Sequence, residues 1–300
     1  MYINPYESTE NAKWRKANLH LHSGVGDMHP ADMMTYMYYE NGYDFLCLSN
    51  HNVYKDFSEY SDDESMKILD GVEYSGTKED PRDMLTIGVR ESLFPIGYQE
   101  AIDKTNAVGG FVILCHPNCP VKNTFSPRQM LDLHGYLGLE VLNWKAFTLG
   151  GNGDATENWD ELLTAGVMAT GFGNDDCHMV VESNHFYNLI ACEEKSLSSV
   201  RQAIVENKVC VSSGLYPVYL RIENGQIRVK VKLNTVLDTH VKEFYYTFVG
   251  PNGKILAEQY AEEGVYTLKD EAYVRVEARI KAGPLILFQP VYQEGALVRP

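Results

Sequence analysis

Short apolar runs alternate with longer amphipathic stretches from about residue 15 to residue 214. This alternation is typical of repeated βα units, whose parallel strands form a sheet or a barrel. The apolar runs predict strands at Ala17–His22, Phe45–Ser49, Ile68–Glu73, Leu85–Val89, Phe111–Cys115, Leu137–Leu142, Val167–Gly171 and Tyr187–Cys192. Helical spacing predicts helices at Pro30–Asn41, Tyr98–Val108, Pro127–His134, Thr156–Ala165 and Leu197–Asn207.

After Gly214 the helical pattern stops and strand-like segments follow one another. They are Val218–Ile222, Ile227–Leu233, Phe244–Val249, Val265–Leu268, Tyr273–Ile280 and Leu285–Phe288. Asn224-Gly225 and Asn252-Gly253 are dipeptides that favour tight hairpin turns. We therefore predict two domains, a βα domain over residues 1–214 and a small antiparallel, sandwich-like β domain over residues 215–300.

The composition is that of a globular protein, with 44% hydrophobic and 22% charged residues. Against 26 Lys and Arg stand 41 Asp and Glu, so the net charge is −15, which argues against a broad cationic surface for nucleic acid. No run of about 18 apolar residues occurs, so we expect no membrane span. The six cysteines lie mostly in apolar runs, which favours reduced thiols and a cytoplasmic location, while the oligomeric state is left open.

Two histidines separated by one residue, His20 and His22, fall in the first predicted strand. Alternate residues of a strand share a face, so both imidazoles point the same way and can bind one divalent ion. Taken alone, the pair fits a polar face of a barrel equally well.

Further residues of metal-binding types stand at or just after the ends of successive predicted strands. They are His51, Glu73, His116, Asp176 and His178. The carboxyl ends of barrel strands meet at one face, where active sites are built, so we expect one pocket to collect these side chains. Mixtures of His, Asp and Glu suit manganese, iron and zinc alike.

Five segments carry a resemblance to a known family. They are Asn18-Leu19-His20-Leu21-His22-Ser23, Ser49-Asn50-His51-Asn52, Gly71-Val72-Glu73, Leu114-Cys115-His116-Pro117-Asn118 and Gly173-Asn174-Asp175-Asp176-Cys177-His178. In their order and approximate spacing they resemble the motifs of the PHP (polymerase and histidinol phosphatase) superfamily, over about residues 15–214. The resemblance implies a distorted (β/α)7 TIM-like barrel that holds two or three divalent metal ions (Mn, Zn or Fe), and many members of the superfamily are phosphoesterases.

Carried over to this chain, the resemblance implies three sets of metal ligands. One ion would be held by His20, His22, Glu73 and Asp176, and a second by Glu73, as a bridge, and His116. A third would be held by Asp27, His51 and His178. Asp27 also fits a carboxylate at a helix start, close to Pro30.

The chain departs from the family pattern at two places. Asn50 stands where the family usually has an Asp before the histidine of its second motif, so the orientation of His51 depends on an uncharged amide. No histidine follows the Glu73 strand, where many members supply another ligand to the second ion. Either Asp83 substitutes for it, or that metal position is weak or empty.

Neighbouring divalent ions lower the pKa of a shared water, polarise a phosphoryl oxygen and stabilise the leaving oxygen. We therefore expect a metal-dependent phosphoesterase that hydrolyses a small phosphorylated metabolite or nucleotide through a metal-bound hydroxide. Asp176 and His178 are the candidates for catalytic proton handling, and Asn118 and Lys145 are candidates for binding the substrate phosphate. Two alternatives stay open: a metal-dependent hydrolase of another ester or an amide, and a non-catalytic protein that binds metal or carbohydrate.

Overall fold

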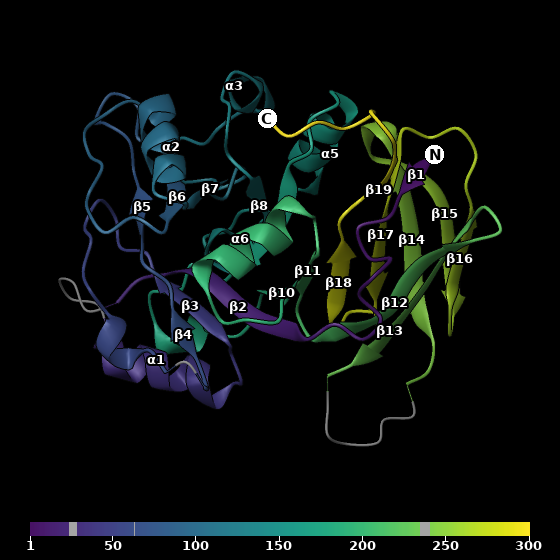
Figure 1. Cartoon of the computed structure of the whole chain (residues 1–300), viewed down its shortest axis with the longest axis horizontal. Coiled ribbons are helices and arrows are strands. Elements are labelled where there is room, and N and C mark those ends of the chain that lie inside the picture. The colour runs from purple at the N-terminus through teal and green to yellow at the C-terminus, as the bar shows by residue number, and fades with distance from the viewer. Residues whose placement is uncertain (24–28, 63, 235–240) are drawn as a thin grey trace.

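Strands and helices alternate through the N-terminal part of the chain, and strands dominate the C-terminal part (Figure 1). The computed structural model describes residues 1–23, 29–62, 64–234 and 241–300. The helices are α1 (Ala31–Glu40), α2 (Tyr98–Ala107), α3 (Pro127–Leu131), α4 (Trp144–Thr148), α5 (Thr156–Thr164) and α6 (Leu197–Val205), with 3₁₀ turns at Ser58–Tyr60, Val180–Glu182 and Pro251–Gly253. No helix in these ranges is both long enough and apolar enough to cross a membrane.

The strands of the N-terminal part are β1 (Tyr2–Ile3), β2 (Trp14–Leu21), β3 (Phe45–Leu48), β4 (Lys67–Ile68), β5 (Gly71–Tyr74), β6 (Met84–Ile87), β7 (Phe111–Leu114), β8 (Gly138–Asn143), β9 (Thr170–Asn174), β10 (Tyr187–Ala191) and β11 (Val209–Ser212). Those of the C-terminal part are β12 (Leu215–Glu223), β13 (Gln226–Leu233), β14 (Phe244–Gly250), β15 (Lys254–Ala261), β16 (Gly264–Thr267), β17 (Tyr273–Arg279), β18 (Leu285–Phe288) and β19 (Val291–Gln293). The expected helices and strands have counterparts whose ends differ by a few residues, with one exception. The expected strand Ile68–Glu73 is divided between β4 and β5, which belong to two different sheets.

Two sheets meet in the N-terminal part. One has the order β5-β6-β7-β8-β9, and the other contains the run β4-β3-β2-β10-β11. Isolated bridges pair Leu21 with Cys177 and His51 with Glu73, so the two sheets touch at the ends of β2 and β3. Within the described ranges the hydrogen-bonded ladders do not close into a continuous barrel, but the bridges bring the carboxyl ends of several strands together.

The prediction of an all-parallel βα repeat is wrong at two strands. β6 runs antiparallel to both β5 and β7, and β10 runs antiparallel to β2. The link between β5 and β6, residues 75–83, contains no helix, and a parallel pair needs a longer crossover, usually a helix. The parallel pairs are β2–β3, β3–β4, β7–β8 and β8–β9. As a result, the start of β6 lies beside the carboxyl ends of its neighbours.

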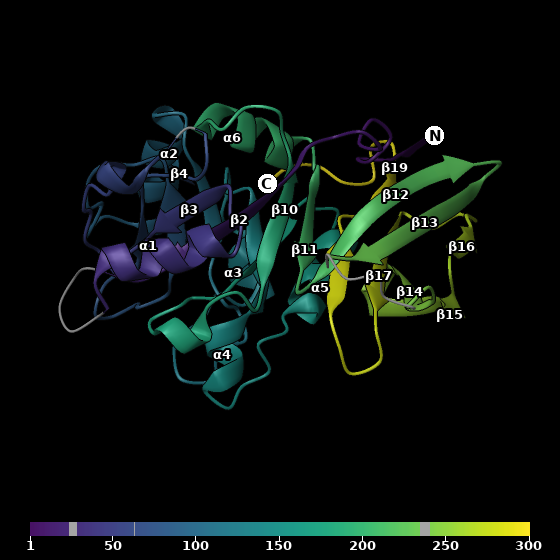
Figure 2. The ribbon, with the colours of Figure 1, turned by 90° about the horizontal axis from the view of Figure 1, so that it is seen from below.

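The strands after Gly214 pair only in antiparallel fashion, as the turn signals predict. β12, β13 and β16 form a separate sheet, whereas β18 pairs with β11 and so continues the sheet of the N-terminal part. Seen from below, α1, α2, α4 and α6 lie on one side of the molecule and β12 to β16 on the other (Figure 2). The end of the chain returns to the N-terminal part, where Arg299 donates to the carbonyl oxygens of Leu137 and Ile204.

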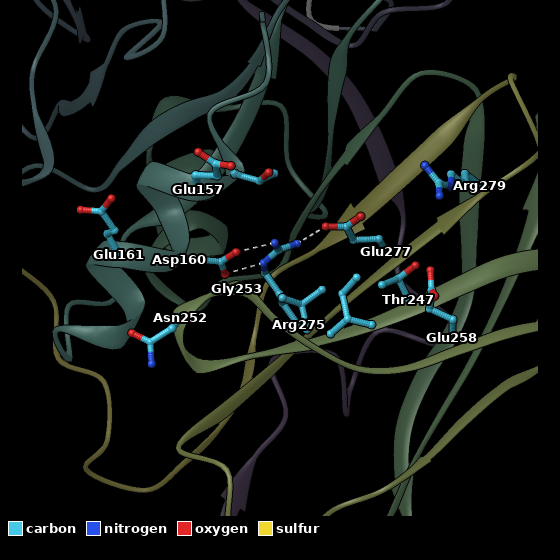
Figure 3. A pocket seen from close by; sticks show the side chains of 13 residues that line it. Glu157, Asp160, Glu161, Thr247, Asn252, Gly253, Glu258, Arg275, Glu277 and Arg279 are labelled. Carbon is cyan, nitrogen blue, oxygen red and sulfur yellow. Dashed lines mark hydrogen bonds and ion pairs between the residues drawn. The ribbon is translucent and has the colours of Figure 1, made fainter.

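A buried ion pair joins helix α5 to strand β17. Arg275 Nε lies 2.7 Å from Asp160 Oδ1 and Nη2 lies 2.6 Å from Oδ2, and the remaining nitrogen pairs with Glu277 (Figure 3). The side chains of Arg275 and Asp160 are only 4% and 6% exposed. A two-point contact of this kind has a defined geometry, and here it ties a helix of the N-terminal part to a strand of the C-terminal part.

We expect Asp160→Ala to lower the free energy of unfolding by about 3 to 5 kcal/mol. The Arg275 guanidinium stays buried but loses both hydrogen bonds to Asp160 and keeps only the pair with Glu277. Urea denaturation of the purified chain measures this loss. Glu157→Ala, on the exposed side of the same helix, is the matched control and should change the free energy by less than about 0.5 kcal/mol. Equal losses in the two variants would contradict the assignment.

Candidate metal centre

The Glu73 carboxylate lies at the middle of a histidine cluster. Its Oε1 is 3.3 Å from Nε2 of both His20 and His116, and its Oε2 is 3.2 Å from His22 Nε2 and 2.8 Å from His51 Nδ1. The side chain of Glu73 is fully buried. Strand β2 supplies His20 and is followed by His22, and the other two histidines follow β3 and β7. The structure therefore brings the ends of three strands to the carboxylate that β5 carries.

Asp176 faces the same cluster from the segment that follows β9. Its Oδ1 lies 3.4 Å from His20 Nε2 and 3.2 Å from His22 Nε2, and its Oδ2 lies 3.9 Å from His116 Nε2. His178 completes the group, with its ring centroid 4.3 Å from that of His22. Asp27, the remaining predicted ligand, lies outside the described residues.

Several polar atoms in this cluster are buried and form no hydrogen bond of suitable geometry within the described structure, although other groups of the cluster lie close to them. They are His20 Nε2, both ring nitrogens of His22, His116 Nδ1 and Glu73 Oε2. Buried polar atoms are almost always paired in folded proteins, because leaving them unpaired costs free energy. A divalent cation would satisfy imidazole nitrogens and carboxylate oxygens together, so these residues fit a metal site.

Among the residues that the structure describes, four sets of side chains have ligand atoms within 4.8 Å of one another. They are His20, Glu73, Cys115 and His116; His22, His51 and His178; His20, His22 and Asp176; and His51, Glu73 and Asp83. Glu73 and His20 each belong to two sets, so the sets overlap in one centre. This arrangement could hold more than one ion with shared carboxylates.

Burial and charge act against each other on the pKa values of the centre. Burial alone would lower the pKa of His22 and His116, but contacts with Asp176 and Glu73 outweigh it and raise both pKa values. Burial would raise the pKa of Glu73, but the surrounding histidines hold it well below its usual range. His22 and His116 therefore keep their protons to higher pH than an ordinary imidazole, and Glu73 keeps its charge to lower pH than an ordinary carboxylate.

His178 behaves in the opposite way. Burial and the neighbouring His22 lower its pKa to about 4. Its Nδ1 lies 2.9 Å from the carbonyl oxygen of Asp176, which can only accept, so Nδ1 carries the proton of the neutral ring. Nε2 is then unprotonated and is free to ligate a cation or to accept a proton.

Glu140, in the middle of strand β8, supports two of the histidines from behind. Its Oε1 lies 2.8 Å from His20 Nδ1, and its Oε2 accepts from the backbone N–H of His116 at 2.9 Å. The second contact holds the backbone of His116 at a φ of +26°, which residues other than glycine rarely adopt. Glu140 is not among the predicted site residues, although a carboxylate inside an otherwise apolar strand is a signal for it.

The predicted substrate-binding residues lie beside the centre, where each makes a hydrogen bond within the protein. Lys145 Nζ pairs with Glu182, whose other oxygen accepts from the backbone N–H of His178 at 2.8 Å. Asn118 Nδ2 donates to the Asp154 carbonyl oxygen at 2.8 Å. Lys145 is therefore tied to the segment that carries His178, and Asn118 to the loop after α4.

The two departures from the family pattern have clear places in the structure. Asn50 exchanges two hydrogen bonds of 3.0 Å with the backbone of Ser23, and so holds the segment after His22 against the end of β3. Asp83 stands just before β6, and its Oδ2 lies 3.6 Å from His116 Nε2. The reversed direction of β6 is what brings Asp83 to the centre.

Comparisons with solved structures give a shared fold. A two-domain protein from Bacteroides vulgatus ATCC 8482, which contains a predicted PHP-like metal-dependent phosphoesterase, matches 93% of this chain over 93% of its own, with 14% identity and a TM-score of 0.53. The likeness extends over both parts of the chain. It confirms the predicted PHP resemblance at the level of the fold.

Two other structures match with TM-scores below 0.5. PsfC from Pseudomonas syringae PB-5123 covers 64% of this chain and 87% of its own, at 13% identity and a TM-score of 0.46. A candidate metal-dependent phosphoesterase from Bifidobacterium adolescentis ATCC 15703 covers 56% of this chain and 89% of its own, at 15% identity and a TM-score of 0.41. No protein-family model matches the sequence, and no curated protein matches it.

We expect Glu140→Gln to weaken metal binding by roughly 10- to 100-fold, because a neutral amide orients His20 less firmly and lowers its basicity as a ligand. Equilibrium dialysis against chelator-buffered Zn²⁺, with metal analysis of the protein, measures the change. Glu157→Gln is the control and should bind as the parent does. An unchanged affinity in Glu140→Gln would show that the carboxylate does not tune the ligand.

Metal binding should release protons, and affinity should rise with pH. The raised pKa values of His22 and His116 mean that these rings stay protonated to higher pH than an ordinary histidine, so an ion must displace the protons at lower pH and is bound more tightly once they have left. Calorimetric titrations in buffers of different ionisation enthalpy measure the protons released. Identical apparent enthalpies in all buffers would contradict this expectation.

Proposed function

We propose that this protein is a metal-dependent phosphoesterase that hydrolyses a small phosphorylated metabolite or nucleotide. The observation that carries the proposal is the buried cluster around Glu73, in which histidine nitrogens lack hydrogen-bond partners at the place where the strand ends meet. The fold shared with a protein containing a predicted PHP-like phosphoesterase supports it. The order of the five sequence motifs supports it independently.

The arrangement of the strands is consistent with the barrel that the family resemblance implies. The bridges Leu21–Cys177 and His51–Glu73 link β2 to the segment after β9 and the segment after β3 to β5, which supports a distorted (β/α)7 barrel built from β2, β3 and β5 to β9. Residues 1–214 form the catalytic domain in this proposal, and residues 215–300 form an accessory β domain. The six buried, unpaired cysteines are typical of a protein of the reducing cytoplasm.

Two or three divalent ions, Mn, Zn or Fe, would be held by the centre. His20, His22 and Asp176 with Glu73 would bind one, and Glu73 and His116, with Asp83 nearby, would bind another. A third would take His51 and His178, together with Asp27. Such ions supply Lewis acidity and an activated water for attack on phosphorus.

The side chains of the centre have complementary tasks. Glu140 accepts a hydrogen bond from the Nδ1–H group of His20 and so directs Nε2 toward Glu73 and Asp176. Asp176 and His178 are placed to hold or accept a proton at Oδ1 and at Nε2, and the low pKa of His178 keeps its ring neutral at physiological pH. Lys145, kept near His178 by Glu182, and Asn118 would contact the substrate phosphate.

Reconstitution with each metal followed by a panel of phosphomonoesters and phosphodiesters tests the proposal. We expect turnover of at least one ester with Mn, Zn or Fe, and a fall of at least about 100-fold in His22→Ala, because an ion ligand is lost. His134→Ala changes an exposed histidine that belongs to none of the four sets of candidate ligands. It is the matched control and should retain full activity. No turnover above His22→Ala with any metal would reject the proposal, and turnover of carboxylic esters or amides alone would select the other hydrolase class.

A further inference from the structure

Asp83 is placed to ligate an ion together with Glu73 and His116. Only 2% of Asp83 is exposed, and its Oδ2 lies 3.6 Å from His116 Nε2, which in turn lies 3.3 Å from Glu73 Oε1. Ligand atoms about 2.1 Å from a tetrahedral ion stand roughly 3.4 Å apart, so these separations suit a shared ion. The antiparallel course of β6 is what supplies this carboxylate in place of a histidine.

The ammonium group of Lys122 already occupies the oxygen that such an ion would use. Lys122 Nζ donates to Asp83 Oδ2 at 2.8 Å, and this is the same oxygen that faces His116. Lys122 belongs to the loop that begins at His116 and turns at Cys119, whose backbone N–H donates to the His116 carbonyl oxygen at 2.9 Å. The Lys122 side chain is 38% exposed, so the ammonium enters from the rim of the centre.

We propose that the Lys122 ammonium competes with a divalent ion for Asp83, and so weakens the metal position formed by Glu73, Asp83 and His116. Two cations on one carboxylate oxygen repel each other strongly where little water is present to screen them. An ion that binds there must displace the ammonium or share the oxygen with it. Among the described residues no lysine forms a hydrogen bond or ion pair with His20, His22 or Asp176, so we expect that position to bind its ion more tightly.

Metal titration of the whole chain tests the competition, which rests on the metal centre of the proposed function. The protein is stripped with a chelator and titrated with Zn²⁺ or Mn²⁺ alone, with bound ions counted after equilibrium dialysis. We expect the wild type to show a tighter and a weaker class of site. Lys122→Met keeps the length of the side chain and removes its charge, so the weaker class should tighten by roughly tenfold or more while the tighter class stays within about twofold.

Two further variants separate contact from general electrostatics. Asp83→Asn should abolish the weaker class with or without Lys122 and preserve the tighter class, which also shows that the variant folds. Lys145→Met removes a charge that is paired with Glu182 near His178, and it should leave the weaker class unchanged.

The competition is overturned if Lys122→Met leaves the weaker class unchanged or weaker, or if Lys145→Met tightens it equally. A Lys122→Met variant that raises KM for phosphate esters at unchanged metal affinity would make Lys122 a substrate-binding residue and also overturn it. A wild type that binds no ion at all would reject the metal centre itself. A wild type that binds ions and turns over esters, but whose weaker class ignores Lys122, would reject the competition alone.

Discussion

The burial of the Glu73 carboxylate among four imidazoles is the interaction on which the centre depends. A carboxylate removed from water costs several kcal/mol unless opposite charge or hydrogen bonds compensate for it. Here the compensation comes from His20, His22, His51 and His116, which reach Glu73 from the ends of β2, β3 and β7. The register and direction of these strands, and the geometry of the segments that follow them, must therefore all be correct for the four imidazoles to reach the Glu73 carboxylate.

Two neighbouring carboxylates, Glu140 and Asp175, hold the residues of the centre in position. Glu140 joins His20 and the backbone of His116, and also accepts from Asn143 and Asn174. Asp175 accepts from the backbone N–H groups of residues 184, 185 and 186, and so closes the loop that carries Asp176 and His178. The Tyr38 hydroxyl and the Asn18 amide also donate to Asp175, and the ring of His20 is a further partner of Glu140. Most of the contacts that hold these two carboxylates therefore come from backbone and amide groups.

The sequence predicted the centre better than it predicted the sheet around it. Apolar runs locate a strand, and a strand end followed by His51 or His116 places a ligand at an edge whatever the neighbouring strands do. Strand direction is not encoded in the apolar pattern, because parallel and antiparallel strands buried on both faces have the same composition. For this reason the apolar pattern predicts a parallel β6, and the sequence does not decide between Asp83 as a substitute ligand and a weak or empty metal position.

Residues that act through a partner were harder to find. Glu140 lies in an apolar strand with no histidine beside it in the sequence, and its role follows only from contacts with residues 24 and 120 positions away. Lys122 lies in an exposed loop segment, where a lysine carries no signal by itself. Strand β15 was also missed, because its alternation is weak and most of its side chains are at least partly exposed.

Net charge and local charge have different consequences for a phosphorylated substrate. The chain carries −15 overall, and the centre itself contains the carboxylates of Glu73, Asp83, Glu140 and Asp176. Without bound cations, these carboxylates face imidazoles and the ammonium of Lys122, so a phosphate dianion gains little by entering. Each divalent ion adds two positive charges at the point where the phosphoryl oxygens would lie, and reverses the local field while the molecule as a whole stays acidic. In the proposed phosphoesterase, substrate affinity therefore depends on metal occupancy. The acidity of the remaining surface disfavours the binding of anions outside the centre.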